Sequence, residues 1–288
     1  MKKLKRSERL VELTQYLLSR PHSLIPLTTF AERYQSAKSS ISEDLAIIKE
    51  VFQEEGIGEL QTMAGAAGGV RFMPKVPVAQ SLAFIESICR ELEQPDRILP
   101  GGYMYMSDIL GEPRTVNEIG RTFATLFAEI EADAVMTVET KGIPLAYATA
   151  SYLNLPVIIV RRDHSAVEGS AVSINYVSGS AKRMHTMSLG RRALREQSRV
   201  LIVDDFMRAG GTIQGMKDLL AEFRAQVAGV GVFVESGDVE EHLVTDYVSL
   251  ARIQDIDTKS KVACVTPGNY FTAADSSAVS QQRGGVLS

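Results

Sequence analysis

Residues 200–212 read VLIVDDFMRAGGT, and this stretch decides the fold of the larger part of the chain. Four apolar residues lead into two adjacent carboxylates, Asp204 and Asp205, and the stretch ends in two glycines and a threonine. A short run of aliphatic residues is typical of a strand buried on both faces of a parallel sheet. Glycines soon after such a strand predict a turn whose backbone N–H groups converge on a phosphate at the start of a helix.

The segment 134–160 shows the same order of elements. It predicts an apolar strand, a turn at 140–142, a helix and a second apolar strand. The later unit predicts a strand over 199–205, a loop over 206–211 and a helix from Thr212, followed by another apolar strand. Strands that alternate with helices in this way indicate an α/β domain with a parallel sheet and flanking helices. Ligands of such sheets bind beyond the carboxyl ends of the strands, where both turns are expected.

The acid pair and the glycine turn together predict a ribose 5-phosphate ligand. Asp204 and Asp205 can accept hydrogen bonds from two neighbouring hydroxyls, while the loop 208–212 binds the phosphate. Two alternatives remain on these residues alone. The acids could belong to a metal site or be solvated, and the two glycines could form only a turn.

In this arrangement the chain resembles the type I phosphoribosyltransferases, whose two ligand loops occur in the same order. The resemblance implies a phosphoribosyl pyrophosphate site made of Asp204, Asp205, Phe206, Met207, Arg208, Ala209, Gly210, Gly211 and Thr212 around the ribose phosphate, and of Thr140, Lys141 and Gly142 around the diphosphate. Two residues depart from the enzymes. Arg208 is always protonated and cannot act as a general base, and Ala209 lacks the hydroxyl of the threonine common in the family. We therefore expect binding without catalysis, with no catalytic residue and no cofactor acting as a catalyst.

Two residues before the first α/β unit are further candidates. Tyr103 could stack on a nucleotide base and Arg97 could pair with a phosphate, although an aromatic residue at a strand start also fits a core position. The residues leave open whether Mg²⁺ accompanies the effector, and they predict no metal site of their own.

The first 74 residues predict a separate domain. Helical spacing of apolar residues indicates helices over 5–19 and 27–34 and a third within 37–56, after which 58–63 and 70–74 read as two strands joined by a glycine-rich loop. Three helices followed by a hairpin are typical of a winged helix-turn-helix domain. Pro74 and Pro77 predict an extended linker over 74–80. We expect domains at 1–74 and 75–271, and a frayed polar tail at 272–288.

The third helix of this domain is expected to read DNA in the major groove. The candidate contacts are Ser36, Lys38, Ser39, Ser40, Ser42 and Glu43 at its start, the basic residues Lys2, Lys3, Lys5, Arg6 and Arg9 near the N-terminus, and Arg71 on the wing. The alternatives are that the serines only cap a helix, that the domain docks a protein, and that Arg71 is solvated.

The chain up to about residue 271 resembles the purine operon repressors of Gram-positive bacteria. The runs AKSSISEDLAIIKE (37–50) and DDFMRAGGT (204–212) carry this resemblance. It implies a homodimeric repressor that binds a double-stranded DNA operator of purine genes and is released by phosphoribosyl pyrophosphate. Two alternatives stay open: a purine phosphoribosyltransferase with an accessory N-terminal domain, and an activator or dual regulator.

A basic segment over 161–192 predicts a long hairpin with strands near 172–177 and 184–189. It corresponds to the flexible arm of the transferases and carries Arg161, Arg162, Lys182, Arg183, Arg191 and Arg192, which could bind diphosphate, DNA or a second subunit, or could be solvated.

The composition is that of an ordinary globular protein. The 288 residues are 45% hydrophobic with a formal net charge of −4, which excludes a globally basic nucleic-acid coat protein. No apolar run is long enough to span a membrane, so we expect a cytoplasmic protein without a membrane partner. Cys89 and Cys264 lack metal-ligand spacing and are expected to be buried thiols.

Overall fold

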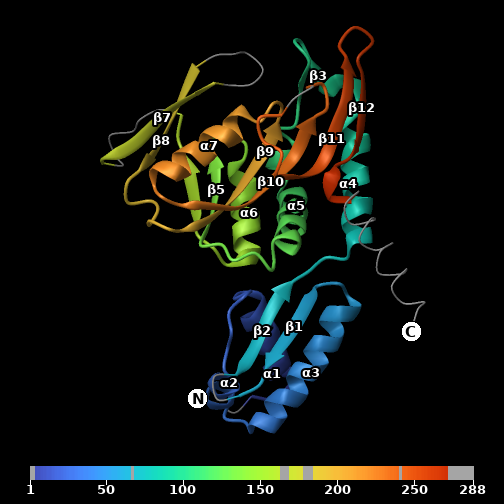
Figure 1. Ribbon diagram of the computed structural model, residues 1–288. Helices are drawn as coiled ribbons and strands as arrows, with labels where there is room; N and C mark the ends of the chain where they lie inside the picture. Colours follow the sequence, from blue (N-terminus) through green and yellow to red (C-terminus); the bar gives the residue numbers. More distant parts are fainter. Residues whose placement is uncertain (1–3, 66–67, 163–168, 178–183, 240–241, 272–288) are drawn as a thin grey trace, which may run out of the picture.

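The protein consists of a small N-terminal domain and a larger α/β domain (Figure 1). The computed structural model describes residues 4–65, 68–162, 169–177, 184–239 and 242–271. The expected tail at 272–288 therefore lies outside the described residues. Within the described chain no helix is both long enough and apolar enough to cross a membrane.

The N-terminal domain has the predicted winged helix-turn-helix order. Its elements are α1 (Arg6–Leu18), α2 (Leu27–Tyr34), α3 (Lys38–Glu54) and the antiparallel strands β1 (Gly58–Met63) and β2 (Gly69–Pro74). The apolar faces of the helices and the hairpin enclose one core, which includes Leu13, Leu17, Phe30, Ile41, Ile48, Phe52 and Leu60. Leu18, which also fits the helical spacing of α1, lies outside this core and is 42% exposed.

The linker between the domains is shorter than predicted. Pro77 is the N-cap of α4 (Val78–Leu92), so only three residues after Pro74 have an extended path. The fixed φ of proline suits the start of a helix as well as an extended chain, and the following segment has apolar residues at helical spacing. The helix places Ile85, Ile88 and Leu92 in the core of the larger domain, and this packing favours a helix over an extended chain after Pro77.

The larger domain is built on a six-stranded sheet in the order β12-β11-β10-β9-β5-β6. The strands are β5 (Ala134–Val138), β6 (Val157–Val160), β9 (Arg199–Met207), β10 (Gln226–Ser236), β11 (Val248–Asp257) and β12 (Val262–Pro267). All neighbouring pairs are parallel except β11 with β12. The strand that carries Asp204 is therefore central, between β5 and β10.

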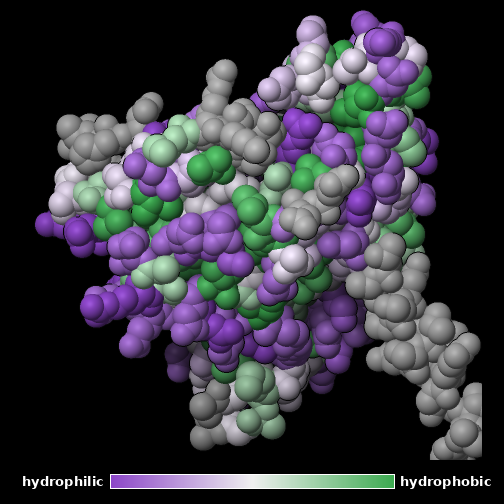
Figure 2. All heavy atoms as spheres, turned by 45° about the horizontal axis from the view of Figure 1, so that its top comes forward, coloured by the Kyte–Doolittle hydropathy of each residue, from purple (hydrophilic) through white to green (hydrophobic). Residues whose placement is uncertain are grey.

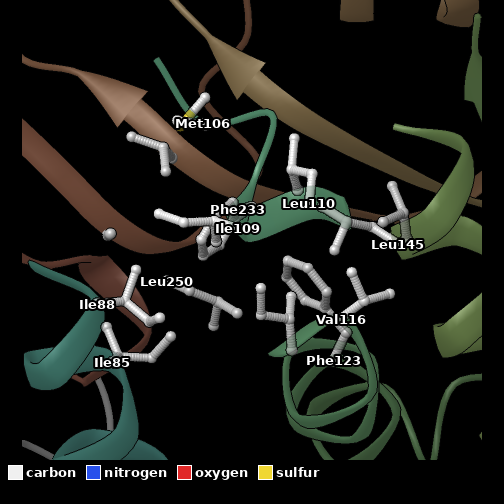
Figure 3. Close-up of a cluster of buried hydrophobic side chains, with 14 of the residues drawn as sticks. Ile85, Ile88, Met106, Ile109, Leu110, Val116, Phe123, Leu145, Phe233 and Leu250 are labelled. Atoms are coloured by element: carbon white, nitrogen blue, oxygen red, sulfur yellow. The ribbon is translucent and has the colours of Figure 1, made fainter. Parts of the chain in front are cut away.

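Both faces of this sheet are covered, as the continuous apolar strands predicted. Helices α4, α5 (Pro113–Leu126) and α6 (Ile143–Leu153) pack on one face, where Leu201 and Val203 join the core that Figure 3 shows around Phe123, Leu145, Phe233 and Leu250.

The other face carries α7 (Gly211–Glu222) and the hairpin of β7 (Ala171–Val177) and β8 (Met184–Gly190). The predicted hairpin is thus present, and its connecting residues lie outside the described chain. Alternate residues of β9 serve the two cores, because Val200 and Ile202 face α7.

The central strand is longer than predicted, which shortens the loop after it. The sequence favoured a loop from Phe206, but Phe206 pairs with Val234 and Met207 pairs with Glu235 on β10. The loop before α7 is therefore confined to 208–210, since the ladder to the neighbouring strand continues past the acid pair.

A small two-stranded sheet, β3 (Ile98–Leu99) with β4 (Tyr103–Met104), lies between α4 and α5 in the sequence. Two short 3₁₀ helices flank it, η1 (Pro95–Arg97) and η2 (Ile109–Gly111).

Hydrogen bonds tie the two domains together at the end of α3. The guanidinium of Arg121, on α5, donates to the carbonyl oxygen of Gly56 and, at 3.1 Å, to that of Lys75. The N–H of Val76 donates to Thr125 Oγ1 at 3.0 Å. Because Gly56 directly follows the last turn of α3, a helix of the larger domain holds the end of the expected recognition helix.

The two cysteines differ, although both were expected to be buried. Cys89 is buried in α4, and burial raises the pKa of its thiol to about 12. Cys264 is exposed on β12 because its neighbours Ala263 and Val265 face the core and strand residues alternate.

We predict that Phe123→Ala destabilises the larger domain by about 3–5 kcal/mol. Phe123 is fully buried and packs against Phe127 and the backbone of Gly231, so truncation leaves a cavity between α5 and the sheet. The measurement is the urea midpoint followed by circular dichroism. Val262→Ala is the control, since Val262 is 58% exposed, and it should change stability by less than about 0.5 kcal/mol. Equal effects of the two substitutions would contradict this packing.

Candidate functional site

A cavity of about 810 Å³ lies at the carboxyl ends of β5, β9 and β10. Figure 2 brings this end of the molecule forward and shows hydrophilic side chains intermingled with hydrophobic ones. The predicted residues that line the cavity are Asp204, Asp205, Phe206, Met207, Arg208, Ala209, Gly210, Gly211, Thr212, Thr140, Lys141 and Tyr103. The topology thus brings together two loops that are more than 60 residues apart, as expected from the ends of parallel strands.

The acid pair is the most buried charged part of the site. Asp204 is 3% exposed, and its Oδ1 accepts a hydrogen bond from the backbone N–H of Asp205 at 3.0 Å. Burial raises the pKa of both carboxyls, and the neighbouring charge of Asp205 raises that of Asp204 further. The positive charge of Arg162 lowers the pKa of both groups in part, and that of Lys141 acts on Asp205. Hydroxyl donors placed here would stabilise the ionised pair.

Gly142 brings the first loop against the acid pair. A Cβ at this position would lie 2.2 Å from Thr137 Oγ1 and 2.9 Å from Asp204 Oδ1, so no larger residue fits without a shift. Gly142 itself does not line the cavity, but it is the N-cap of α6 and it places Thr140 and Lys141 at the cavity wall. The close approach of the two strand ends explains the glycine in the predicted Thr140 to Gly142 turn.

The second loop has the geometry of an anion site. Gly210 has φ of 84°, in the left-handed region that favours glycine, and α7 begins at the next residue. The first N–H groups of a helix have no acceptor within the helix and carry its positive dipole end. Here they lie at the cavity, since Gly211, Thr212 and Ile213 line it. The carbonyl of Ala209 is held from behind by the N–H of Leu243 at 2.9 Å.

Arg208 is paired in the cavity wall instead of being a free cation. Its Nη2 lies 2.6 Å from Asp238 Oδ2, and Ser236 donates to the other carboxylate oxygen at 2.7 Å. The hydrogen bond from Arg208 lowers the pKa of Asp238. The carboxylate of Asp238 therefore offsets the positive charge of Arg208 at the cavity wall.

Arg97 was wrongly assigned to the ligand site. Its side chain is 10% exposed and does not line the cavity. Nη1 and Nη2 donate to the two carboxylate oxygens of Asp108, both at 2.8 Å, and Nη2 also pairs with Glu91. The guanidinium of Arg97 is therefore paired with acidic side chains of the protein itself, next to β3. Tyr103, by contrast, is 69% exposed at the cavity, which removes the alternative that it is a core residue.

Several lining residues were not assigned to the cavity from the sequence. They include Arg162, Glu139, Ser236, Asp238, Asp255 and the apolar Met106, Ile253 and Ile256. Arg162 was considered with the basic hairpin, and diphosphate was one of its possible partners. The structure places it in the cavity wall, where its N–H donates to Glu139 Oε1 at 2.6 Å. A usable signal existed for Arg162 and Asp238, because each lies within two residues of the carboxyl end of a strand.

The other basic residues of the hairpin are dispersed. Arg161 lies 3.7 Å from Glu139, and Arg191 and Arg192 are exposed after β8. Lys182 and Arg183 lie outside the described residues.

The expected DNA-contacting residues fall into exposed and internally bonded groups. Lys5, Arg6, Lys38, Ser39, Ser42 and Glu43 are exposed. Ser40 is partly buried, and Lys2 and Lys3 lie outside the described residues. Ser36 is also partly buried, and its hydroxyl accepts from Arg9 and donates to the carbonyl of Tyr34, each at 3.1 Å. Arg71 donates to Gln61 Oε1 at 2.8 Å across the wing.

Arg9 does not belong to the exposed basic group. It is buried and bonded to the carboxylate of Asp44, so the expectation of a phosphate contact is corrected for this residue.

Comparisons with known proteins match both domains. Residues 5–74 match the family described as "Bacterial purine repressor, N-terminal", and residues 106–270 match the "Phosphoribosyl transferase domain". The chain is 58% identical over 269 residues to the purine biosynthesis transcriptional repressor PurR of Bacillus subtilis, covering 93% of this chain and 94% of the relative. The chain belongs to this family of purine biosynthesis transcriptional regulators. It is itself a regulator of that class.

Other relatives show the range of this family and of the proteins that are similar to its larger domain. The regulator is 44% identical over 268 residues to the purine biosynthesis transcriptional activator PurR of Lactococcus lactis subsp. lactis, covering 93% of this chain and 99% of the relative. It is 31% identical over 189 residues to a xanthine phosphoribosyltransferase of Levilactobacillus brevis, covering 64% of this chain and 96% of that enzyme. A solved adenine phosphoribosyltransferase from Thermoanaerobacter pseudethanolicus has the same fold, with a TM-score of 0.52 at 20% identity over 58% of this chain and 99% of that one.

Among the residues that the structure describes, no group of three or more histidine, cysteine or acidic side chains is arranged to hold a metal ion.

We predict that Asp204→Asn stabilises the regulator in the absence of ligand. The folded-state pKa of Asp204 is raised by burial, so the folded protein favours the neutral form, and the amide is neutral at every pH. Stability of the natural protein falls as pH rises from about 4, the unfolded value, to the raised folded value, and then levels off. Near neutral pH the free energy of unfolding of the variant should exceed that of the natural protein by on the order of 1 kcal/mol, which corresponds to ~2–4 °C in Tm.

Thermal unfolding across a pH series measures this difference, which should vanish towards about pH 4. The exposed Asp218 on α7 provides the control Asp218→Asn, which should show no such dependence. If Asp204→Asn is less stable than the natural protein at every pH, the ionised Asp204 carboxylate does not destabilise the folded protein, and the prediction is wrong.

Proposed function

We propose that the protein represses purine biosynthesis genes by binding operator DNA as a homodimer, and that phosphoribosyl pyrophosphate in the cavity weakens this binding. One observation carries the proposal: the buried acid pair, the 140–142 loop and the start of α7 meet in a single cavity. Its volume of about 810 Å³ lies within the range common for small-molecule sites.

The parts of the cavity suit the parts of the effector. The carboxylates of Asp204 and Asp205 accept hydrogen bonds from the two ribose hydroxyls, and the N–H groups at 210–212 bind the 5-phosphate. Lys141 and the backbone of its loop bind the diphosphate. The cation of Arg162 lies near the acid pair and is available for the same group. Mg²⁺, if it accompanies the diphosphate, would be held through phosphate oxygens and at most a few carboxylates.

The wall of the cavity supports sensing over catalysis. Arg208 is held by Asp238 at the position where a transferase would need a proton acceptor, and a guanidinium stays protonated. Ala209 supplies no hydroxyl to the phosphate. The relatives that match nearly the whole chain carry the names of transcriptional regulators, including a repressor and an activator.

The N-terminal domain supports DNA binding through an exposed polar face of α3. Lys38, Ser39 and Ser42 are exposed there, and Lys5 and Arg6 add charge at the start of α1. A homodimer places two such helices on successive turns of the major groove and multiplies their specificity. Sedimentation at low protein concentration tests the dimer directly.

The contact between the domains provides a route for the effector. The loop at 140–142 leads into α6, which packs against α5, and α5 carries the Arg121 bond to Gly56 at the end of α3. An effector that binds one arrangement of these helices more tightly than another favours that arrangement. If the two arrangements differ in DNA affinity, effector binding changes the affinity for DNA, typically 5- to 150-fold.

The proposal predicts that phosphoribosyl pyrophosphate lowers operator affinity in the natural protein but not in Asp205→Asn. The amide is neutral and has only one acceptor oxygen, so it accepts weaker hydrogen bonds from the ribose hydroxyls. Effector affinity should fall at least ~10-fold while DNA binding stays intact. The measurement is anisotropy of a labelled duplex from upstream of a purine biosynthesis operon, titrated with effector, and calorimetry of effector binding. Asp218→Asn is the control outside the cavity and should respond like the natural protein.

An unchanged operator affinity at millimolar effector would overturn the sensor proposal. The 31% identity to a xanthine phosphoribosyltransferase over 64% of this chain leaves a second candidate to be tested, an enzyme with an accessory domain. Release of pyrophosphate from phosphoribosyl pyrophosphate in the presence of xanthine, guanine, hypoxanthine or adenine would support that candidate instead.

A second prediction concerns Gly142→Ala. The new Cβ would displace Thr137 Oγ1 or the carboxylate of Asp204, so effector affinity should fall ~10-fold or more. Gly111→Ala is the matched control, because a Cβ there meets no atom within 4 Å. Calorimetry with phosphoribosyl pyrophosphate distinguishes the two variants, and normal effector binding by Gly142→Ala would refute the tight approach of the strand ends.

A further inference from the structure

A fully buried carboxylate lies inside the N-terminal domain, where the apolar core needs no charge. Asp44, on α3, is 0% exposed. Its Oδ2 accepts from Arg9 Nε at 2.5 Å and its Oδ1 accepts from Arg6 Nε at 3.1 Å. Replacing a buried ion pair by apolar residues is often neutral or stabilising, so stability alone does not explain this group.

The two arginines that Asp44 holds have different surroundings. The Arg9 side chain is 10% exposed, and its Nη1 donates to Ser36 Oγ at 3.1 Å. Ser36 in turn donates to the carbonyl of Tyr34, so Arg9 braces the turn between α2 and α3. In that turn Gln35 has the left-handed backbone that redirects the chain.

Arg6 faces outward from the same carboxylate. Its side chain is 56% exposed, and its Nη2 lies 4.0 Å from the exposed Glu43 on α3. The guanidinium therefore lies at the edge of the exposed face of α3 that carries Lys38, Ser39 and Ser42. A guanidinium fixed through Nε has lost much of its rotamer freedom and presents its terminal nitrogens as a planar fork, which suits a phosphate.

We propose that Asp44 is a positioning residue for DNA binding. It holds Arg6 as a clamp on one backbone phosphate, and through Arg9 it fixes the turn that sets the direction of α3. The inference rests on the proposed function, since it assigns a role within operator binding. Asp44 itself touches no DNA.

Charge and position predict opposite effects of Asp44→Asn. The substitution removes one negative charge near the DNA, so charge alone would strengthen binding to any duplex. Loss of positioning instead weakens operator binding, and we expect ~10-fold lower affinity with little change on a scrambled duplex.

Arg6→Gln tests the clamp without leaving a buried charge unpaired. It keeps the bond between Arg9 and Asp44 and alters a side chain that is mostly exposed. Loss of one phosphate contact should reduce the slope of log affinity against log salt by about 1. Arg6→Lys keeps the charge but not the fork, and should retain the slope with lower operator affinity.

The experiment measures anisotropy of the full chain on a labelled duplex from upstream of a purine biosynthesis operon and on a scrambled duplex, over a range of salt. The control is Arg224→Gln, which removes an exposed arginine that pairs with Glu196 in the larger domain. It should leave affinity and slope unchanged. Circular dichroism verifies that each variant is folded.

The outcomes separate this inference from the proposed function. If the natural protein does not prefer the operator duplex, the proposed function fails. If it does, but Arg6→Gln has the slope of Arg224→Gln, only the positioning role fails. Tighter operator binding by Asp44→Asn also overturns that role, and should Asp44→Asn not fold, the slope of Arg6→Gln decides.

Discussion

The larger domain depends on placing two adjacent carboxylates near the end of its central strand. Asp204 is buried, and the charge of Asp205 next to it makes ionisation less favourable. Such a pair persists only where donors are close, and the protein supplies a backbone N–H, the field of Lys141 and Arg162, and space for hydroxyl donors from a ligand. The close approach at Gly142 follows from the same arrangement, because the neighbouring strand must end beside Asp204.

The surrounding charges decide what kind of site this is. Arg208 and Asp238 neutralise each other at one wall, while Lys141 and Arg162 act on the acid pair at another. Lys141 and Arg162 line the cavity where a diphosphate is proposed to bind, and Arg208 is a permanent cation that cannot accept a proton. A fold shared with transferases can in this way serve regulation, since function lies in the site and not in the fold.

A second buried carboxylate organises the N-terminal domain, and the two domains meet through backbone carbonyls. Asp44, in the N-terminal half of α3, links this helix to α1, and Arg121 donates to the carbonyl of Gly56 just after the end of α3. Arginine side chains from other elements thus bond to α3 at Asp44 and to the chain directly after it. The 140–142 loop of the cavity leads into α6, α6 packs against α5, and α5 contacts the end of the helix that is proposed to read DNA.

The sequence by itself determined the elements whose signal is local. The apolar runs before Thr140 and Asp204 predicted buried parallel strands, their turns predicted a common ligand site, and helical spacing predicted the three helices of the first domain. The strand and helix predictions are confirmed, because burial on both faces and helix periodicity are visible in consecutive residues. The two turns do line one cavity, and its ligand stays a prediction. Only the tertiary structure decided the partners of the arginines: Arg97 with Asp108, Arg208 with Asp238, and Arg9 with Asp44. The helix after Pro77 was not predicted, although its apolar residues have helical spacing, because Pro77 also fitted an extended linker. A charged side chain carries no local sign of which opposite charge it will meet across the fold, because that choice depends on packing between distant segments.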